Sequence, residues 1–477
     1  MNLGVLAGAA LGARLFDRLA RNCRHTTMVV WARLLGLLVL ICSMASASGT
    51  DISTTASIKF GAIRWDRWYE GSPETGVLEQ DEWHDRIPFF ARRDRIGRLV
   101  LDGDLENTAA AEVAYARGMG IDYFIFGFYP DTGSWNRSGR TSAELDRALV
   151  SYLRLGDHLG VKFAVSLNQL FPVQDTPDVI ETIVSLMKQP DYVRTDTGTL
   201  PLFLLAQDGS EVSRAFGSDE QARAVFSQLR AAVEKSVGAK LTIILMHYDY
   251  KQAEDARARY GLDMLSTYTN FSPGKGQQSF QSCIEHQANV WAAPLQQHLA
   301  YLPNVTVGWD SRPRGDYAVA QGEPAVQRSW CAEPTQGELD QLFNSARTAA
   351  AQIPAEAPFH SIVVYAWNEF TEGGWLAPTW DNPHRPDTVR RAIATNRPMD
   401  TIRLTFPEPV EFDECPIRST GRSLKRIADC RRAVLHPAPP WPCPPGTGVG
   451  EERVRAPSGL EARVWNGGWR DRTCVRN

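Results

Sequence analysis

Two glutamates three residues apart are the sharpest chemical feature of the sequence. Glu369 and Glu372 lie in AWNEFTEG (366–373), directly after an apolar run rich in β-branched residues. A carboxyl pair of this kind suits cleavage of a glycosidic bond, because one group must protonate the leaving oxygen while the other stays ionised. Burial beside Trp and like-charge repulsion are expected to move the two pKa values apart. We therefore take Glu369 and Glu372 as the candidate catalytic pair.

Other polar and aromatic residues follow the remaining apolar runs of the chain. Aromatic faces stack on sugar rings, and carboxylates, amides and guanidiniums hydrogen-bond to hydroxyls, so these residues are candidates for binding a substrate. Each also has an ordinary interpretation as a helix cap, an ion-pair partner or a core residue. The candidates are Asp66, Trp68, Tyr129, Asn168, His247, Asp249, Trp309, Asp310, Arg312, Trp367, Asn368 and Trp375.

The elements that must position these residues alternate between short apolar runs and amphipathic helical segments. The predicted strands are 58–65, 122–129, 161–168, 200–207, 241–248, 264–270, 304–310 and 361–368. The predicted helices are 109–117, 142–159, 179–188, 219–236, 252–260, 289–299 and 336–352. Strands without clean alternation, separated by helices, are typical of a parallel sheet buried on both faces. Eight such units predict an α/β fold, a (β/α)8 TIM-type barrel, whose active site lies at the carboxyl ends of the strands.

A doubly wound sheet is the alternative architecture. No G-x-G-x-x-G motif follows any of the apolar runs, so the usual phosphate-binding turn of that fold is missing. The sequence has no H-E-x-x-H and no clustered metal-ligand spacing either. The net charge of −4 gives no reason to expect binding to nucleic acid.

The segment AWNEFTEGGWLAP (366–378) resembles the signature of the glycoside hydrolase family 99-like proteins, which include endo-α-mannosidases and WbsX-like proteins. Residues 120–130, 191–205 and 307–314 are similar to further family motifs and occur in the family's order, over roughly residues 57 to 397. The resemblance implies a (β/α)8 barrel, a retaining glycosidase, an oligosaccharide or polysaccharide substrate and no cofactor.

The resemblance also implies roles for the pair. Glu369 would deprotonate the sugar 2-hydroxyl so that it attacks the anomeric carbon, and Glu372 would protonate the departing oxygen and later activate water. This chain has Phe370 and Thr371 where the endo-α-mannosidase motif has Trp and His. If the mechanism is instead an ordinary retaining one with carboxyls about 5 Å apart, the partner of Glu369 is Asp249 or Asp310.

Two other function classes stay open on the sequence. A transferase-like protein of glycan synthesis is one, although the chain lacks a nucleotide-phosphate loop. A non-catalytic glycan-binding barrel is the other, and the presence of both glutamates disfavours it.

The N-terminus has the pattern of an export signal. Arginines precede the apolar run 34–42, which leads to the A-x-A site Ala45-Ser46-Ala47. We expect cleavage after residue 47, with Met28 as a possible true start, so that the protein is secreted or lies in the lumen of the secretory pathway without stable membrane insertion. A type II signal anchor is the alternative, but the apolar run is short for a membrane span.

The rest of the chain is expected to divide into a catalytic barrel at 48–398 and a small appendage at 399–477, which is rich in Pro, Gly and Arg. Six cysteines remain after signal removal, an even number that indicates disulfides in an exported protein. We expect Cys283 to pair with Cys331 between barrel loops, and two further bonds to form among Cys415, Cys430, Cys443 and Cys474, with open connectivity.

Overall fold

The computed structural model describes residues 58–94, 96–130, 145–206, 210–270, 274–314, 329–382 and 385–394, together with the backbone of three short strands near the C-terminus. Those strands, β15 (Thr447–Gly450), β16 (Val464–Trp465) and β17 (Asp471–Arg476), form a small antiparallel sheet. The predicted signal segment lies outside the described residues, as do Cys415, Cys430 and Cys443 and the side chain of Cys474. The proposed domain boundaries and tail disulfides therefore stay predictions.

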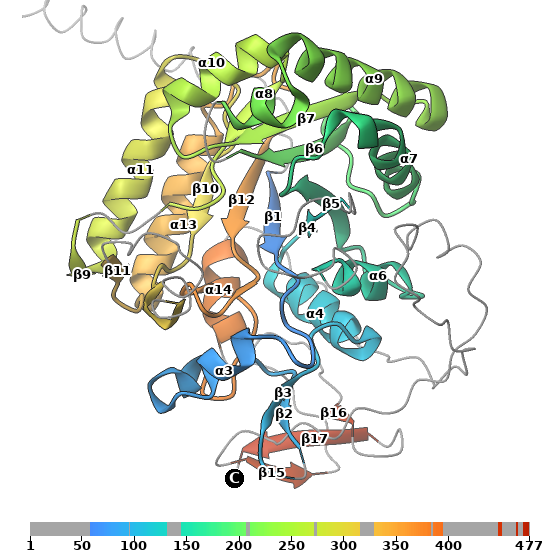
Figure 1. Ribbon diagram of the computed structural model, residues 1–477. Coiled ribbons are helices and arrows are strands. Elements are labelled where there is room, and N and C mark those ends of the chain that lie inside the picture. Colours follow the sequence, from blue (N-terminus) through green and yellow to red (C-terminus); the bar gives the residue numbers. More distant parts are fainter. Residues whose placement is uncertain are drawn as a thin grey trace, which may run out of the picture. The chain divides into compact units, whose positions relative to one another are not determined.

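Eight parallel strands form one sheet that curls into a barrel (Figure 1). The strands are β1 (Lys59–Arg64), β4 (Tyr123–Phe128), β5 (Lys162–Leu167), β6 (Leu200–Leu205), β7 (Leu241–Met246), β8 (Met264–Ser266), β10 (Asn304–Thr306) and β12 (Ser361–Tyr365). Their order is β10-β12-β1-β4-β5-β6-β7-β8. The seam closes beside β8, where the Leu265 amide donates to the Ala300 carbonyl at 2.9 Å and the Leu302 amide donates to the Leu265 carbonyl at 2.8 Å. The predicted (β/α)8 barrel is confirmed.

Helices connect the strands and surround the barrel (Figure 1). They are α4 (Glu106–Met119), α6 (Arg147–Leu153), α7 (Thr176–Met187), α8 (Glu211–Phe216), α9 (Asp219–Val237), α10 (Tyr250–Tyr260), α11 (Phe280–Gln296), α13 (Gln336–Ala350) and α14 (Arg385–Ala394). The helices α8 and α14 are not among those predicted above. Local chemistry fixes several ends: the Ser218 side chain caps α9, Thr335 and Glu338 form a capping box on α13, and Gly238 ends α9 in the left-handed conformation.

Each barrel strand has two buried faces because side chains alternate between the barrel interior and the surrounding helices. On β1, Phe60 contacts Phe343 of α13, with ring centroids 6.1 Å apart. Gly61 faces the interior, where a β-carbon would come within 2.1 Å of the Tyr123 ring. Even-numbered residues of β1 therefore face the helices and odd-numbered residues face the interior. The residues directly after β1 continue this alternation.

A long insertion separates β1 from α4. It contains α3 (Glu74–Leu78), the 3-10 turn η1 (Asp81–Arg86) and the antiparallel hairpin of β2 (Ala91–Arg93) with β3 (Leu99–Leu101). Because it follows the carboxyl end of β1, it lies at the end of the barrel where an active site is expected.

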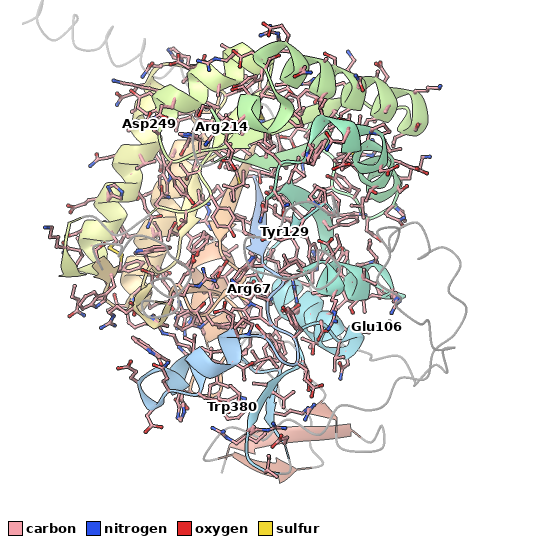
Figure 2. The ribbon with its side chains drawn as sticks, viewed as in Figure 1. Arg67, Glu106, Tyr129, Arg214, Asp249 and Trp380 are labelled. Carbon is pink, nitrogen blue, oxygen red and sulfur yellow. A yellow bond between two sulfur atoms is a disulfide. The ribbon has the colours of Figure 1, made fainter. Side chains whose placement is uncertain are left out.

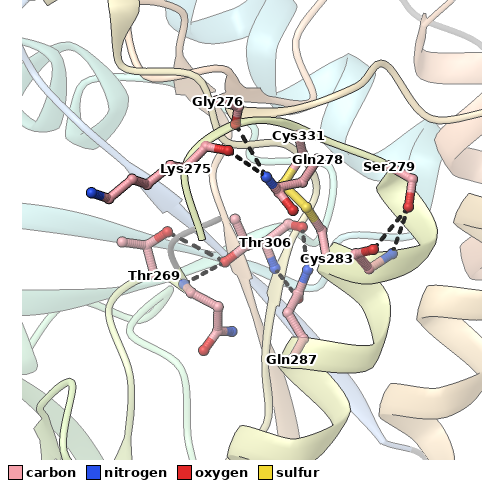
Figure 3. Close-up of a disulfide and its surroundings, with 11 residues drawn as sticks. Thr269, Lys275, Gly276, Gln278, Ser279, Cys283, Gln287, Thr306 and Cys331 are labelled. Atoms are coloured by element: carbon pink, nitrogen blue, oxygen red, sulfur yellow. Dashed lines mark hydrogen bonds between the residues drawn. A yellow bond between two sulfur atoms is a disulfide. The ribbon is translucent and has the colours of Figure 1, made fainter. Parts of the chain in front are cut away.

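The loops after β8 and β10 are joined by a short parallel pair, β9 (Gly276–Gln278) with β11 (Ser329–Cys331). A disulfide links Cys283, in the first turn of α11, to Cys331 of β11 (Figure 3). The predicted pairing of these two cysteines is confirmed. Beside it, the Gln287 side chain of α11 bonds both the amide and the carbonyl of Thr306, at 2.8 and 3.0 Å. A side-chain amide thus supplies the backbone pairing that β10 lacks on this side.

Candidate active site

The glutamate pair sits on a tight hairpin directly after β12. Glu369 lies in β13 (Asn368–Glu369), which pairs with β14 (Gly374–Trp375). Asn368 anchors this hairpin to the end of β1, because its side chain accepts from the Trp65 amide and donates to the Trp65 carbonyl, each at 2.8 Å. Asn368, which the sequence predicts to bind substrate, is fully buried. It holds together the backbone at the carboxyl ends of β1 and β12.

The two glutamates have unequal surroundings. Both oxygens of Glu372 accept hydrogen bonds, one from Arg314 and the other from the hydroxyl of Tyr365. Glu369 is only 2 % exposed; its Oε1 lies 3.5 Å from the Tyr268 hydroxyl and its Oε2 lies 3.6 Å from Nη2 of Arg314. That Oε2 has no hydrogen-bond partner within the described parts of the chain. The Arg314 guanidinium therefore contacts both carboxylates, but it lies closer to Glu372, to which it donates a hydrogen bond.

Burial and the neighbouring charge of Glu372 raise the pKa of Glu369 well above its usual range, although Arg314 opposes the shift. A carboxyl that is taken out of water beside another carboxylate keeps its proton, because ionisation would place two like charges in a poorly solvated space. Glu369 is thus the better proton holder of the pair.

A third carboxylate and a second guanidinium complete the charged cluster. Glu74 of α3 is fully buried, and its Oε1 lies 3.2 Å from Nη1 of Arg67. Its Oε2 accepts a hydrogen bond of 3.2 Å from the hydroxyl of Thr371, the residue between Phe370 and Glu372. The insertion after β1 therefore brings an additional acid to the glutamate hairpin.

An aromatic and amide wall borders this cluster. The ring of Trp65 lies 4.5 Å from the guanidinium carbon of Arg314 and 4.8 Å from that of Arg67. Its indole nitrogen donates to the hydroxyl of Tyr129 at 2.8 Å, and the Asn168 amide donates to the same hydroxyl at 3.4 Å. Burial raises the pKa of Tyr129 to about 12, so the hydroxyl stays protonated and can donate a hydrogen bond. The structure places Tyr129 and Asn168 together at the site.

Asp310 is held by two arginines. Its carboxylate accepts from Arg86 and, through both oxygens, from Arg312 at 2.8 and 2.9 Å. Burial works against ionisation, but the Arg312 hydrogen bond and the nearby Arg86 lower the pKa of Asp310. Arg86 also donates to the carbonyls of Asp310 and Phe370, at 3.1 and 3.4 Å. The Asp310 carboxylate is therefore an anchor for the loops around the glutamate pair.

Arginines and tryptophans alternate in a stack beside this anchor. Each guanidinium carbon lies 4.0 to 5.5 Å from the ring centroids of its aromatic neighbours. The stack runs in the order Trp330, Arg312, Trp83, Arg86, Trp375 and Arg385. Cation–π contacts of this kind fix planar groups face to face. Arg312 and Trp375, both predicted to bind substrate, belong to this stack.

Two other predicted binding residues point toward the helices. Asp66 accepts from Arg64 and from the Leu149 amide, and the Trp367 indole donates to Glu112 at 2.9 Å. Arg64 also bonds Glu112 at 2.9 Å, so this network lies between β1, β12 and α4. Asp66 and Trp367 are therefore not brought together with the glutamate pair.

His247 and Asp249 contact each other at the end of β7. Nδ1 of His247 lies 2.9 Å from both the amide nitrogen and the carbonyl oxygen of Asp249. The exposed Asp249 carboxylate caps α10 by accepting from the amides of Lys251 and Gln252, at 2.8 and 3.1 Å. Figure 2 shows Asp249 near the start of α10, apart from Arg67 and Tyr129.

Trp68 and Trp309 pack at the edge of the site. Trp68 lies edge-on to Phe370, with ring centroids 5.0 Å apart, and Trp309 lies 6.3 Å from the ring of Tyr365. They are 2 and 7 % exposed, so they support the site residues from behind and offer little ring face to a ligand.

Several site residues were missed by sequence reasoning. Arg67 follows a predicted strand, so its position was a usable signal. Arg314 was not missed: the sequence marks it, with Arg312, as a guanidinium that could hold a sugar. Tyr365 lies at the end of β12 with its hydroxyl on Glu372. Glu74 and Arg86 belong to the insertion after β1, where no periodic pattern indicates which side chains reach the site. The described residues contain no group of three or more His, Cys, Asp or Glu placed to hold a metal ion, and no helix among them is long and apolar enough to span a membrane.

Comparison with known proteins gives limited similarity. No protein-family model matches the chain, and no curated protein matches it. Among solved structures, the GH99 endo-α-mannosidase from Bacteroides thetaiotaomicron is similar at 12% identity, with 70% of this chain and 95% of that chain covered and a TM-score of 0.44. A glycoside hydrolase-like protein is similar at 14% identity, with 72% and 97% covered and a TM-score of 0.47. The exo-β-1,4-mannosidase from Opitutaceae bacterium strain TAV5 is similar at 12% identity, with 70% and 60% covered and a TM-score of 0.37. Likeness at this level carries no inference about the reaction.

Proposed function

We propose that this protein is a retaining glycoside hydrolase that cleaves a glycosidic bond in an oligosaccharide or polysaccharide. The observation that carries the proposal is the unequal pair: Glu369 is buried with one oxygen that accepts no hydrogen bond from the described residues, whereas both oxygens of Glu372 accept hydrogen bonds. Glycosidic cleavage needs one protonated and one ionised carboxyl at the same sugar. Their place after the eighth strand, at the carboxyl end of the barrel, supports the same conclusion.

The electrostatics favour Glu369 as the acid in the unliganded protein, which reverses the roles implied by the family resemblance. In this scheme Glu369 gives its proton to the departing oxygen. The ionised Glu372 either removes a proton from the sugar 2-hydroxyl, which then attacks the anomeric carbon, or attacks that carbon itself. Water then attacks the anomeric carbon and gives a proton to Glu369. In the first route Glu372 returns its proton to the sugar 2-oxygen as the bond from that oxygen to the anomeric carbon breaks; in the second the ester bond breaks and Glu372 leaves as a carboxylate.

Asp249 and Asp310 are less suited to act as the partner of Glu369. The Asp249 carboxylate caps α10, and both oxygens of Asp310 accept hydrogen bonds from arginines. Glu372, by contrast, shares the Arg314 guanidinium with Glu369 and is therefore the carboxylate placed to act with it.

The test is a panel of purified glycans incubated with the protein and analysed by mass spectrometry for shortened products. We expect products from the native chain and a fall of orders of magnitude in both Glu369→Gln and Glu372→Gln, with glycan binding nearly intact. Glu254→Gln removes a surface carboxylate of α10 that pairs with Arg257, and serves as the matched control. Full activity of either site variant would reject the assignment. Binding without any product from the native chain would favour a non-catalytic glycan-binding barrel, and lengthened products would favour a transferase.

We also propose that the chain is exported and that the mature protein begins near Ser48. A disulfide between Cys283 and Cys331 accords with folding in an oxidising compartment. N-terminal sequencing of the protein recovered from the secretory pathway or medium tests this, and retention of residues 28–47 would support the signal-anchor alternative.

A further inference from the structure

Glu74 is a buried acid that the proposed reaction does not use. It lies on α3, far along the chain from the glutamate hairpin, and has no solvent exposure. A carboxylate is rarely buried unless charged or hydrogen-bonding groups compensate for the lost water. The groups that compensate here are Arg67 and the hydroxyl of Thr371.

Thr371 connects Glu74 to the guanidinium that holds the pair. Its hydroxyl donates to Oε2 of Glu74 at 3.2 Å and accepts from Nε of Arg314 at 3.0 Å. A hydroxyl has one proton, so donation to Glu74 turns a lone pair toward Arg314. The terminal nitrogens of Arg314 then face Glu372 and Glu369. Glu74 therefore fixes the direction of a hydrogen bond that orients Arg314.

The cluster also has an unbalanced charge. Three carboxylates, those of Glu74, Glu369 and Glu372, share two guanidiniums, those of Arg67 and Arg314. One proton on the carboxylates makes the cluster neutral, and burial strongly favours a neutral cluster. Glu372 is bonded to Arg314 and Tyr365, and Glu74 is bonded to Thr371 beside Arg67, so the proton goes to Glu369.

We propose that Glu74 is a positioning residue of the active site with two opposing effects on Glu369: its charge favours the protonated form, and its hydrogen bond from Thr371 orients Arg314, the guanidinium that opposes protonation. The inference rests on the proposed function for its catalytic consequence, because the retained proton is the one that the leaving oxygen would receive. The position of the proton itself can be measured without a substrate.

The charged and titratable groups around Glu369 come from several elements of the barrel. Glu372 and burial favour the protonated form, Glu74 adds to them, and Arg314 and Arg67 oppose them. Burial, together with nearby carboxylates that include Glu369, raises the pKa of the hydroxyls of Tyr129, Tyr248, Tyr268 and Tyr365.

Infrared difference spectroscopy during a pH titration of the whole protein tests the proposal. The infrared band from the carbonyl stretch of protonated Glu369 is the one that is missing from the spectrum of Glu369→Gln. In Glu74→Gln, which removes a negative charge but keeps the shape, we expect the midpoint of this band to fall by about one pH unit or more. Glu112→Gln is the matched control, because Glu112 is also buried but bonds Arg64 and Trp367. It should leave the Glu369 midpoint unchanged.

A second pair of variants separates the relay from a general loss of structure. Thr371→Val removes the hydroxyl that orients Arg314, so Arg314 stabilises ionised Glu369 less and the midpoint should rise. Thr371→Ser keeps the hydroxyl and should restore the native midpoint. We therefore expect the midpoint of the Glu369 band to fall in Glu74→Gln and to rise in Thr371→Val.

An unchanged midpoint in folded Glu74→Gln, or a Thr371→Val midpoint equal to that of Thr371→Ser, would overturn the proposal. If Glu74→Gln does not fold, the Thr371 pair decides alone. The two failures are distinguishable: expected shifts in a protein that cleaves no glycan would uphold the role of Glu74 and count against the hydrolase, whereas glycan cleavage without the shifts would do the reverse.

Discussion

The backbone amide of Asp310 donates a hydrogen bond of 2.7 Å to the carbonyl of Glu372. This bond joins the loop after β10 to the glutamate hairpin after β12. Two glycines permit the approach: a β-carbon on Gly308 would lie 2.2 Å from the Gly373 carbonyl oxygen, and one on Gly373 would lie 2.4 Å from the Asp310 nitrogen. Gly373 also has a φ of +81°, which L side chains rarely adopt.

Alanine at Gly308 or Gly373 should therefore destabilise the protein and displace the glutamate hairpin. We expect each variant to lower the free energy of unfolding by about 1–3 kcal/mol, measured by urea denaturation, because backbone atoms must move to admit the methyl group. The control is Gly337→Ala on α13, where nothing lies within 4 Å of the added carbon. That change should be neutral or stabilising by up to about 1 kcal/mol. Native stability in both site variants would show that the loops do not meet as described.

Arg86→Lys should weaken the site although the charge is kept. Arg86 uses a planar fork to reach Asp310 and the carbonyl of Phe370, and it stacks between Trp83 and Trp375. Lysine cannot make these contacts together. We expect a loss of about 1–3 kcal/mol in unfolding free energy and a fall in turnover. Arg98→Lys changes a side chain that is 72% exposed and should have no effect on either quantity. If Arg86→Lys and Arg98→Lys have the same unfolding free energy and the same turnover, the structural role assigned to Arg86 is wrong.

Asp66 should contribute less to the free energy of unfolding as the pH rises, whereas most carboxylates contribute more. Burial raises the pKa of Asp66 to about 7, because Arg64, which lowers it, is shared with Glu112. The folded state therefore keeps a proton that the unfolded state releases near pH 4, and the contribution of Asp66 to stability falls as pH rises from about 4 to about 7.

The measurement is the difference in unfolding free energy between Asp66→Asn and the native protein as a function of pH. The variant cannot ionise at this position, so the difference should shift in its favour over that window and be constant on either side. A difference that shifts toward the native protein with rising pH would show that Asp66 is ionised by its pairing with Arg64.

Loss of the disulfide should destabilise the barrel. Cys283 and Cys331 are 48 residues apart, and a cross-link closing a loop of this size restricts the unfolded chain by about 4 kcal/mol in the chain-entropy treatment. A variant with Ala at both positions should unfold at lower denaturant concentration by a corresponding amount. Peptide mapping without reductant supplies the independent check, since free thiols at the two positions in the native protein would exclude the bond.

Much of the fold was predictable because it depends on local patterns. Continuous apolar runs separated by amphipathic segments predicted eight strands and their helices, and the observed strands differ mainly at their ends; β8, for example, is Met264–Ser266 within the predicted 264–270. The position of Glu369 and Glu372 directly after the last strand followed from the same pattern, because a parallel barrel brings all carboxyl strand ends to one mouth.

Only the tertiary structure decided which side chains face that mouth. After β1, Asp66 continues the helix-facing side with Arg64, while Trp65 and Arg67 continue the interior side, because side chains alternate along a strand. Which of the two sets faces inward depends on how the sheet closes, and the local sequence does not carry that information. Glu74 shows the limit most clearly: it meets Thr371 from 297 residues away, out of an insertion without periodicity. Such a contact exists only after the barrel has closed and brought the first and last strand ends together.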